Sequence, residues 1–399
     1  MSEQQVDTGL GLMGVDWEER IDYARMRKER LEKAKQAVAR SGADALFLFR
    51  WENVRYVTSL RTHMWPVMFW GLASAILPNG AEPQLYTMDV DHVKARMPWI
   101  KDTVKEFAGG GLEVFAGAKA WAEDAKQVLK DTKVEPKVIG VDAWNPPLLE
   151  ALPKVFPNTR FVDGQKIILE ARAVKTKDEI NCLKNAMSLT VSGFGAGLEF
   201  LRPGRKECEV LAECFRAMYA NGGEWTQCSN IVCSGPYLAP YRRFTSDRII
   251  DHGDMVVFDI GSCFNGYWGD FTRTFICGKD AQPTKEQVKV HMNAYNAMLA
   301  AIKKIRPGGS TKEVYEAAEP WILGGLLGHG LGLGSAEPPF IVEQSKQEPM
   351  ELKPGMVFSI EPYAGVPGVG GVRLEHNVLC TETGYEIIDK FPFEQRLME

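Results

Sequence analysis

Two neighbouring stretches decide the fold: Met255-Val-Val-Phe-Asp-Ile-Gly261 and, after the turn signal Asn265-Gly266, Tyr267-Trp-Gly-Asp-Phe-Thr-Arg-Thr-Phe275. The first is an apolar run that predicts a buried strand ending near Asp259, and the second alternates as a strand that carries Asp270. A hairpin would bring the two carboxylates together, where they repel unless a proton or a cation lies between them. Taken alone, the pair is better explained as a surface hairpin with two solvated acids.

Three further polar residues stand in similar surroundings downstream. His329 is flanked by glycines in Gly328-His-Gly-Leu-Gly-Leu-Gly334, and glycines let the backbone approach a bound group. Glu361 ends another apolar run, and Glu375 lies in the alternating stretch Val372–Leu379. A lone histidine is usually structural, and each acid alone could be the ion-pair partner of an arginine, either Arg373 or Arg273. Carboxylates buried in apolar strands nevertheless need a cation, and four oxygen donors with one imidazole suit one or two ions such as Mn²⁺, Fe²⁺, Co²⁺ or Zn²⁺.

Size and composition narrow the class of protein. The chain has 399 residues, too many for one ordinary core, so two domains are expected. A net charge of -5 argues against nucleic acid as the main partner, because phosphate binding needs a basic face. We find neither a long apolar run nor the pattern of a signal peptide, so no membrane span is expected. The 8 cysteines form no Cys-x-x-Cys pair, which predicts reduced thiols in a cytoplasmic protein.

Strand and helix patterns alternate in the first part of the chain. Residues 20–42 predict a helix, and apolar runs predict strands at 45–49, 72–77 and 84–88. This pattern predicts an α/β domain over residues 1–168. Thr176-Lys-Asp-Glu179 is a capping box that opens a long helix of a second domain, residues 169–399.

The second domain contains a weak internal repeat. Phe200-Leu-Arg-Pro-Gly204 and Ile305-Arg-Pro-Gly308 each end one amphipathic helix and precede another. The repeat suggests a duplicated α/β unit, although the chemistry of turns alone explains the likeness equally well.

Five frames together resemble the pita-bread metallopeptidases, a family that includes methionine aminopeptidase, aminopeptidase P and prolidase, with creatinase as a non-peptidase relative. The frames are Val257-Phe-Asp-Ile-Gly261, Gly266-Tyr-Trp-Gly-Asp-Phe-Thr-Arg-Thr274, Gly328-His-Gly-Leu-Gly332, Ser359-Ile-Glu-Pro362 and Arg373-Leu-Glu375. The resemblance implies an α+β protein. Its second domain would have the pita-bread fold, with duplicated α/β units and an antiparallel sheet covered by helices, after a smaller α/β domain of the creatinase and prolidase type.

The resemblance also implies a site with two divalent metal ions. Asp259 and Asp270 would hold one ion, His329 and Glu361 the other, and Asp270 and Glu375 would bridge them. Two ions held in this way could share one hydroxide, which becomes a usable nucleophile near neutral pH. Glu361 would be the nearest base for the attacking water.

Two departures concern the substrate. The peptidases carry two further histidines that contact substrate; here Tyr241 or Arg242 stands at the first position and Ala336 at the second. Beside a complete ligand array, these departures predict hydrolysis of a C–N bond in a small polar compound or an atypical dipeptide. The resemblance further implies a homodimer, in which Trp65 reaches a neighbour's site. The candidate substrate contacts are Trp65, Tyr241 and Arg373.

Another likeness opens a second class of function. Arg50–Trp70, Gly222–Trp225, Ser234–Pro236 and Lys390–Met398 resemble the branch that includes dimethylsulfoniopropionate lyase, which cleaves a carbon–sulfur bond. In a lyase the metals would bind the substrate carboxylate, and Glu337 is a candidate base.

Aromatic residues bear weakly on this alternative. Tryptophans could form a cage around an ammonium or sulfonium group, although they more often pack cores. The five candidates are Trp51, Trp65, Trp70, Trp225 and Trp268. A third alternative is a binding protein without catalysis, which the retained set of five ligands disfavours.

Overall fold

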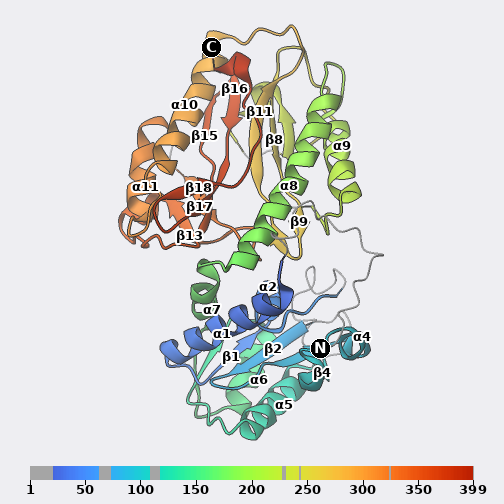
Figure 1. The fold of residues 1–399 in the computed structure, drawn as a ribbon, viewed down its shortest axis with the longest axis vertical. Helices are drawn as coiled ribbons and strands as arrows, with labels where there is room; N and C mark the ends of the chain where they lie inside the picture. Colours follow the sequence, from blue (N-terminus) through green and yellow to red (C-terminus); the bar gives the residue numbers. More distant parts are fainter. Residues whose placement is uncertain are drawn as a thin grey trace.

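The computed structural model describes residues 21–62, 73–107, 117–226, 231–241, 244–322 and 325–398. Two bodies of helix and sheet lie end to end, and α7 (Gly164–Ala173) and α8 (Lys177–Phe200) run between them (Figure 1). The division predicted at residues 168 and 169 falls within α7, and it stays a prediction. Among the helices described, none is both long and apolar enough to span a bilayer.

The first body is a six-stranded mixed sheet with helices packed on it. The strand order is β4-β3-β2-β1-β5-β6, in which β1 pairs antiparallel with β2 and parallel with β5. The strands are β1 (Ala45–Leu48), β2 (Ala73–Pro78), β3 (Gln84–Thr87), β4 (Val104–Glu106), β5 (Val138–Val141) and β6 (Arg160–Asp163). The helices are α1 (Tyr23–Ser41), α2 (Trp51–Thr58), α4 (Val90–Arg96), α5 (Ala118–Asp131) and α6 (Pro146–Val155). The predicted helix at 20–42 and the three predicted strands are confirmed within a few residues.

The second body repeats one arrangement, two helices followed by antiparallel strands. The first half has α8, α9 (Glu207–Ala220) and the sheet β11-β8-β7, with β7 (Ile231–Ser234), β8 (Met255–Ile260) and β11 (Phe271–Ile276). The second half has α10 (Lys285–Ile302), α11 (Thr311–Ala318) and the sheet β13-β12-β14-β17-β18. Its strands are β12 (Leu326–Gly330), β13 (Glu337–Val342), β14 (Val357–Ile360), β17 (His376–Cys380) and β18 (Tyr385–Ile387). Two short hairpins complete this body: β9 (Cys263–Phe264) with β10 (Tyr267–Trp268), and β15 (Tyr363–Val366) with β16 (Gly370–Arg373).

Local chemistry explains where the helices of the second body begin. The predicted capping box is confirmed, because the Thr176 amide donates to Glu179 Oε2 over 2.9 Å while the Thr176 hydroxyl caps the Glu179 amide. Ser310 caps α11 in the same way. Gly204 and Gly308, which end the two Arg-Pro-Gly stretches, both have positive φ, so each turn uses a conformation that favours glycine.

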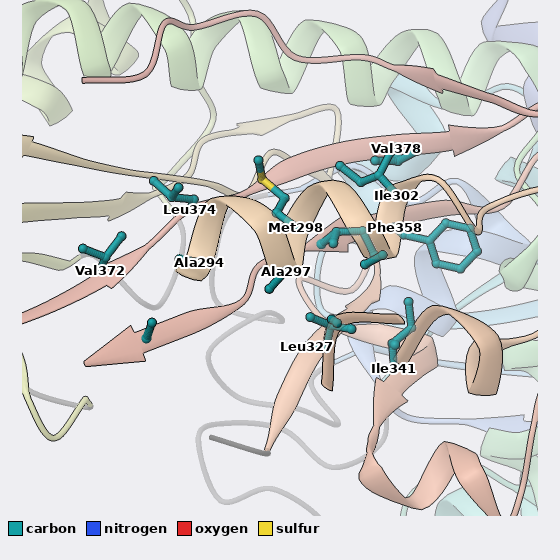
Figure 2. Packing of buried hydrophobic residues seen from close by; sticks show 14 of the residues in the cluster. Ala294, Ala297, Met298, Ile302, Leu327, Ile341, Phe358, Val372, Leu374 and Val378 are labelled. Atoms are coloured by element: carbon teal, nitrogen blue, oxygen red, sulfur yellow. The ribbon is translucent and has the colours of Figure 1, made fainter. Parts of the chain in front are cut away.

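The core of the second body lies between α10 and the strands (Figure 2). Small side chains on one face of α10, such as Ala294 and Ala297, let the helix approach the strands closely, and Met298 and Ile302 fill the remaining space. Phe358 of β14 is fully buried in this core. Burying a side chain of that size contributes about 1.5–3 kcal/mol. This packing holds β14 and β17, which frame the site described next.

The strand patterns predicted for 267–275 and 372–379 were wrong in one respect. Neither stretch is one alternating strand: the chain leaves the sheet at Gly269–Asp270 and at Leu374–Glu375. β11 and β17 that follow are buried throughout, since helices or neighbouring strands cover both faces. Asp270 and Glu375 therefore lie in breaks between strands, where sheet pairing does not fix the backbone and both carboxylates can point toward one site.

Candidate metal centre

Three carboxylates from distant parts of the chain converge. Asp259 lies in β8, Asp270 immediately precedes β11, and Glu375 lies between β16 and β17. β8 and β11 pair antiparallel with Asp259 opposite Thr272, which places Asp259 and Asp270 side by side. Each of the three residues offers one oxygen within 4.8 Å of the others, and all three are buried. The solvated hairpin considered above is therefore excluded.

His329 and Glu361 join this cluster from the adjoining sheet. β12 and β14 pair antiparallel with His329 opposite Ser359, two residues before Glu361. His329 Nε2 lies 3.2 Å from Glu361 Oε1 and 3.6 Å from Asp270 Oδ2. The five residues predicted to act together thus meet at one buried point.

Arg373 and Tyr241 close one side of the cluster. Arg373 Nη1 donates to Asp259 Oδ2 over 2.7 Å, and Nη2 forms an ion pair with Glu361. The Tyr241 hydroxyl donates to the same Asp259 oxygen over 2.6 Å and accepts a bond from Arg373. Burial and the charge of Asp259 raise the pKa of Tyr241, so the phenol stays protonated. Burial opposes the charge of Arg373, but Glu361 and Asp259 outweigh it and raise the arginine pKa.

Three polar residues that the sequence interpretation missed hold Glu375 and the chain beside it. Thr272 and Ser359 donate to the two carboxylate oxygens of Glu375 over 2.8 and 2.7 Å. Asn377 donates to the backbone oxygen of Asp270 over 2.5 Å. Each lies two residues from a member of the cluster, and residues i and i+2 share a face in extended chain. That spacing was a signal that could have found them.

Charge makes this cluster a cation site. Four carboxylates (Asp259, Asp270, Glu361, Glu375) face the guanidinium of Arg373 and the imidazole of His329, so acidic groups outnumber basic ones by two. Burial and the neighbouring carboxylates raise the pKa of Glu375. Burial lowers the pKa of His329, but Glu361 and Asp270 outweigh it and raise that pKa to about 9. Buried oxygen donors that would otherwise take up protons, beside one imidazole, fit divalent metal ions.

The glycines around His329 serve the sheet. A side chain at Gly328 would collide with the backbone oxygen of Ser359 in β14, and one at Gly330 would lie 2.6 Å from the backbone oxygen of Pro338 in β13. The expectation that these glycines approach a bound group is therefore revised, because their close neighbours are strands on both sides of β12.

The two remaining candidate site residues are Glu337, whose carboxylate pairs with two cations that are not part of the cluster, and Trp65. Glu337, the candidate base, is buried in β13, where it pairs with Arg172 and with Lys175 over 2.9 Å. Burial alone would raise its pKa, but the two cations outweigh burial and lower it. Trp65, like Trp70 and Arg242, lies outside the described residues.

Two of the five tryptophans lie together near the cluster. Trp225 and Trp268 have ring centroids 6.3 Å apart, and Trp268 is two residues before Asp270. Trp51 is buried in α2 of the first body and belongs to a core. A second aromatic pair lies at the site itself, since the rings of Tyr241 and Tyr363 have centroids 4.9 Å apart and Tyr241 contacts Asp259. Among the seven described cysteines there is no disulfide, and Cys228 is outside the described residues.

Known families match both bodies of the structure. The model of metallopeptidase family M24 matches residues 181–382, and that of the creatinase/prolidase N-terminal domain matches residues 30–174. The Xaa-Pro dipeptidase of Pyrococcus furiosus is 29% identical over 376 residues, which cover 91% of this chain and 98% of the relative. The Xaa-Pro dipeptidase of Pyrococcus horikoshii is 27% identical over 372 residues, 91% of this chain and 97% of the relative.

Solved structures agree. Dipeptidase PepE from Mycobacterium ulcerans superimposes with a TM-score of 0.76 at 26% identity, covering 94% of this chain and 98% of the other. The Xaa-Pro dipeptidase from Bacillus anthracis gives a TM-score of 0.78 at 24% identity, covering 92% and 99%, and shows a likeness of fold. The predicted pita-bread fold with a creatinase-type first domain is confirmed, and the protein is a metal-dependent hydrolase of the peptidase type. The chain belongs to metallopeptidase family M24.

Proposed function

We propose that this enzyme hydrolyses a C–N bond in a dipeptide of restricted type or in a small polar amide. The observation that carries the proposal is the convergence of four buried carboxylates and His329, with Arg373 and Tyr241 at their edge. Two divalent ions (Mn, Fe, Co or Zn) would balance the excess negative charge of these groups. When bound, they would supply Lewis-acid activation of water and of the scissile carbonyl.

The proposed ligand roles follow the arrangement of the side chains. Asp259 and Asp270 would hold one ion, and His329 and Glu361 the other. Asp270, 3.6 Å from His329 Nε2 and beside Asp259, lies between these pairs, as a bridging ligand must. Glu375 is the second proposed bridge, and its hydrogen bonds from Thr272 and Ser359 fix the direction of its carboxylate.

Glu361 is the proposed proton acceptor. Its carboxylate lies between the imidazole of His329 and the guanidinium of Arg373, both of which favour its charged form. A charged carboxylate at the edge of a buried cluster can take a proton from the attacking water and deliver it to the departing amine. Arg373 acts as a positioning residue, since its two terminal nitrogens contact Asp259 and Glu361 together.

Tyr241 restricts the substrate. In the peptidases that the sequence resembles, a histidine stands near this position. A phenol held protonated can donate a hydrogen bond but cannot exchange protons at neutral pH as an imidazole does. We therefore infer a substrate narrower than that of an ordinary peptidase. Because two similar relatives are named Xaa-Pro dipeptidase, Xaa-Pro dipeptides are the first compounds to test.

The alternatives have less support. The base proposed for a lyase, Glu337, is held by Arg172 and Lys175 in a buried ion pair. A buried carboxylate that two cations keep ionised is a weak acceptor for a substrate proton. The binding-only function is set aside, because the protein is a metal-dependent hydrolase of the peptidase type. The lyase activity, the homodimer and the cytoplasmic location stay predictions.

The decisive experiment loads the purified full chain with each of the four metals in turn. Bound metal is counted by mass spectrometry, and hydrolysis is measured with a panel of Xaa-Pro dipeptides, other dipeptides and small amides. We expect more than one ion per chain and amine release from a small part of the panel. A protein that binds no metal, or a metal-loaded protein that cleaves nothing in the panel, contradicts the proposal. Dimethylsulfoniopropionate, with headspace detection of dimethyl sulfide, tests the lyase alternative in the same samples.

A further inference from the structure

Four arginines line a cavity between the first domain and the hairpin β9–β10. The cavity has a volume of about 220 Å³, and its arginines are Arg27, Arg30, Arg55 and Arg61. Arg27 and Arg30 are three residues apart on α1, a spacing that puts both on one face of a helix. Arg55 comes from α2, and Arg61 follows that helix.

The carboxylates near these arginines are too few to neutralise them. Glu224 pairs with Arg61 over 2.9 Å and lies 3.8 Å from Arg55. Arg30 reaches a second acid only through a hydroxyl, since it donates to Tyr267, which donates to Glu179. Within the described part of the chain, no carboxylate forms an ion pair with Arg27, whose guanidinium lies 4.1 Å over the Trp99 ring.

Arg30 shows that the site is built for a further partner. The residue is 2% exposed, yet its Nε has no hydrogen-bond acceptor among the described residues. Unsatisfied buried donors of this kind are rare in folded proteins. Its Nη2 donates to the hydroxyl of Ser59, which has a φ of 53°. This left-handed conformation belongs to the C-terminal cap of α2, where the Ser59 amide donates to the backbone oxygen of Arg55 over 2.8 Å.

The electrostatics agree with the geometry. Burial lowers the pKa of Arg27 and of Arg55, and the nearby charge of Arg30 lowers both further, although Glu224 opposes this at Arg55. Cations that disfavour one another in a half-enclosed cavity would be stabilised by an anion among them.

We propose that this arginine pocket binds a phosphate-type oxyanion, either free phosphate or the phosphoryl group of a small phosphomonoester. Guanidinium groups match phosphate oxygens through paired, charge-assisted hydrogen bonds. A second cavity of about 320 Å³ shares Arg27, Ser59 and Trp99 with the first. Its wall includes Leu31, Val57, Pro83 and Ile100, which gives an apolar place for the organic part of a monoester.

The pocket adjoins the hairpin that leads to the metal centre. Arg55 donates to the Asn265 side chain over 3.1 Å, and a Cβ at Gly266 would lie 2.5 Å from Arg55 Nη1. Arg30 donates to Tyr267 over 3.0 Å, three residues before Asp270. An anion in the pocket would therefore be bound by arginines that also hold this hairpin to the first domain.

Isothermal titration of the metal-loaded full chain with inorganic phosphate and with phenyl phosphate, at constant ionic strength, tests the proposal. Arg27→Gln and Arg61→Gln remove charge from the pocket. Arg40→Gln is the matched control, because Arg40 is an exposed arginine of α1 paired with Glu170 away from the pocket. Metal ions held at the proposed centre would also attract phosphate, so the quantity that decides is the difference in binding between the pocket variants and the control.

We expect each pocket variant to bind phosphate about tenfold or more weakly at the arginine pocket, the effect of losing a charge-assisted hydrogen bond. Arg40→Gln should bind as the unmodified protein does. Tighter binding of phenyl phosphate assigns the pocket to monoesters, and equal binding assigns it to the free anion. If both pocket variants, shown to be folded by circular dichroism, bind phosphate and phenyl phosphate as Arg40→Gln does, the proposal is overturned.

Discussion

The Tyr241 hydroxyl donates a hydrogen bond to Asp259 Oδ2 over 2.6 Å. The same oxygen accepts from Arg373 Nη1, so one proposed metal ligand is oriented by two donors from different parts of the chain. Residues that orient ligands in this way contribute to metal affinity and to the basicity of the ligands. Tyr241, which stands near the position of a histidine in the related peptidases, therefore orients a proposed ligand of the metal centre.

Tyr241→Phe removes this hydroxyl and keeps the ring. We expect metal affinity or activity to fall by about 10–100-fold, the usual effect of losing such a partner. Competition with a chelating dye measures the affinity. Tyr363→Phe is the matched control, because Tyr363 stacks on Tyr241 at 4.9 Å but donates to the backbone of Leu238. Equal metal affinity in the two variants would show that the hydroxyl of Tyr241 does not support the centre.

Glu361→Gln tests the proposed proton acceptor. The amide keeps the size of the side chain but cannot accept a proton, so kcat should fall by about 10²–10⁴-fold. Metal content must be measured in the same preparation, because Glu361 is also a proposed ligand. Glu316→Gln changes an exposed acid paired with Lys312 on α11, and it should leave kcat unchanged. If the Glu361→Gln enzyme holds its full metal content and has the kcat of the unmodified enzyme, Glu361 is not the proton acceptor.

Much of the centre could be predicted because each acid follows or interrupts an apolar run. Asp259 and Glu361 stand at the ends of buried strands, where a charge without a partner is unfavourable. The capping box at Thr176 could also be predicted from the sequence, since it depends on two residues three positions apart. Patterns of this kind are local, so they can be recognised without knowledge of the tertiary structure.

Arg373 was expected as a possible ion-pair partner of one acid, and this is confirmed. That it pairs with two of them could not be predicted, because this depends on contacts between distant strands. That Arg373 would lie between Asp259 and Glu361 follows from how β16 packs beside β8, which no local pattern records. The ion pair of Glu337 with Arg172 joins residues 165 positions apart in the same way. The breaks at Asp270 and Glu375 were missed, because the alternation of apolar and polar residues continues across them and predicted one unbroken strand in each stretch.

His291 makes the protein sensitive to acid. The residue is fully buried in α10, and among the described residues neither ring nitrogen has a hydrogen-bond partner. Burial lowers its pKa from 6.5 to about 4. Between these values the unfolded chain binds a proton that the folded protein does not, so stability falls as pH falls from 6.5 toward 4. The loss is about 3 kcal/mol, from about 1.4 kcal/mol for each pKa unit.

His291→Leu should flatten this acid dependence of the free energy of unfolding, measured with urea between pH 4 and pH 7. Replacing a buried group that lacks hydrogen bonds by an apolar one is nearly neutral at higher pH. His252→Leu is the control, since His252 is exposed and pairs with Asp280, and it should keep the acid dependence. Identical profiles for the two variants would rule out His291 as the source.

Gly328→Ala tests whether the glycine beside His329 is needed by the sheet. The new methyl group would collide with the backbone oxygen of Ser359, which belongs to the strand that delivers Glu361. The nearest atom is a backbone oxygen of β14 and not the end of a flexible side chain, so β12 and β14 must move apart, at a cost of about 1–3 kcal/mol or more. Because His329 and Glu361 lie on either side of this contact, the metal content should fall together with the midpoint of urea unfolding.

Gly384→Ala is the matched control. Its new methyl group meets no atom within 4 Å, so the unfolding midpoint and the metal content should be unchanged. A Gly328→Ala protein with the midpoint and metal content of that control would mean that close strand pairing does not hold the two residues together.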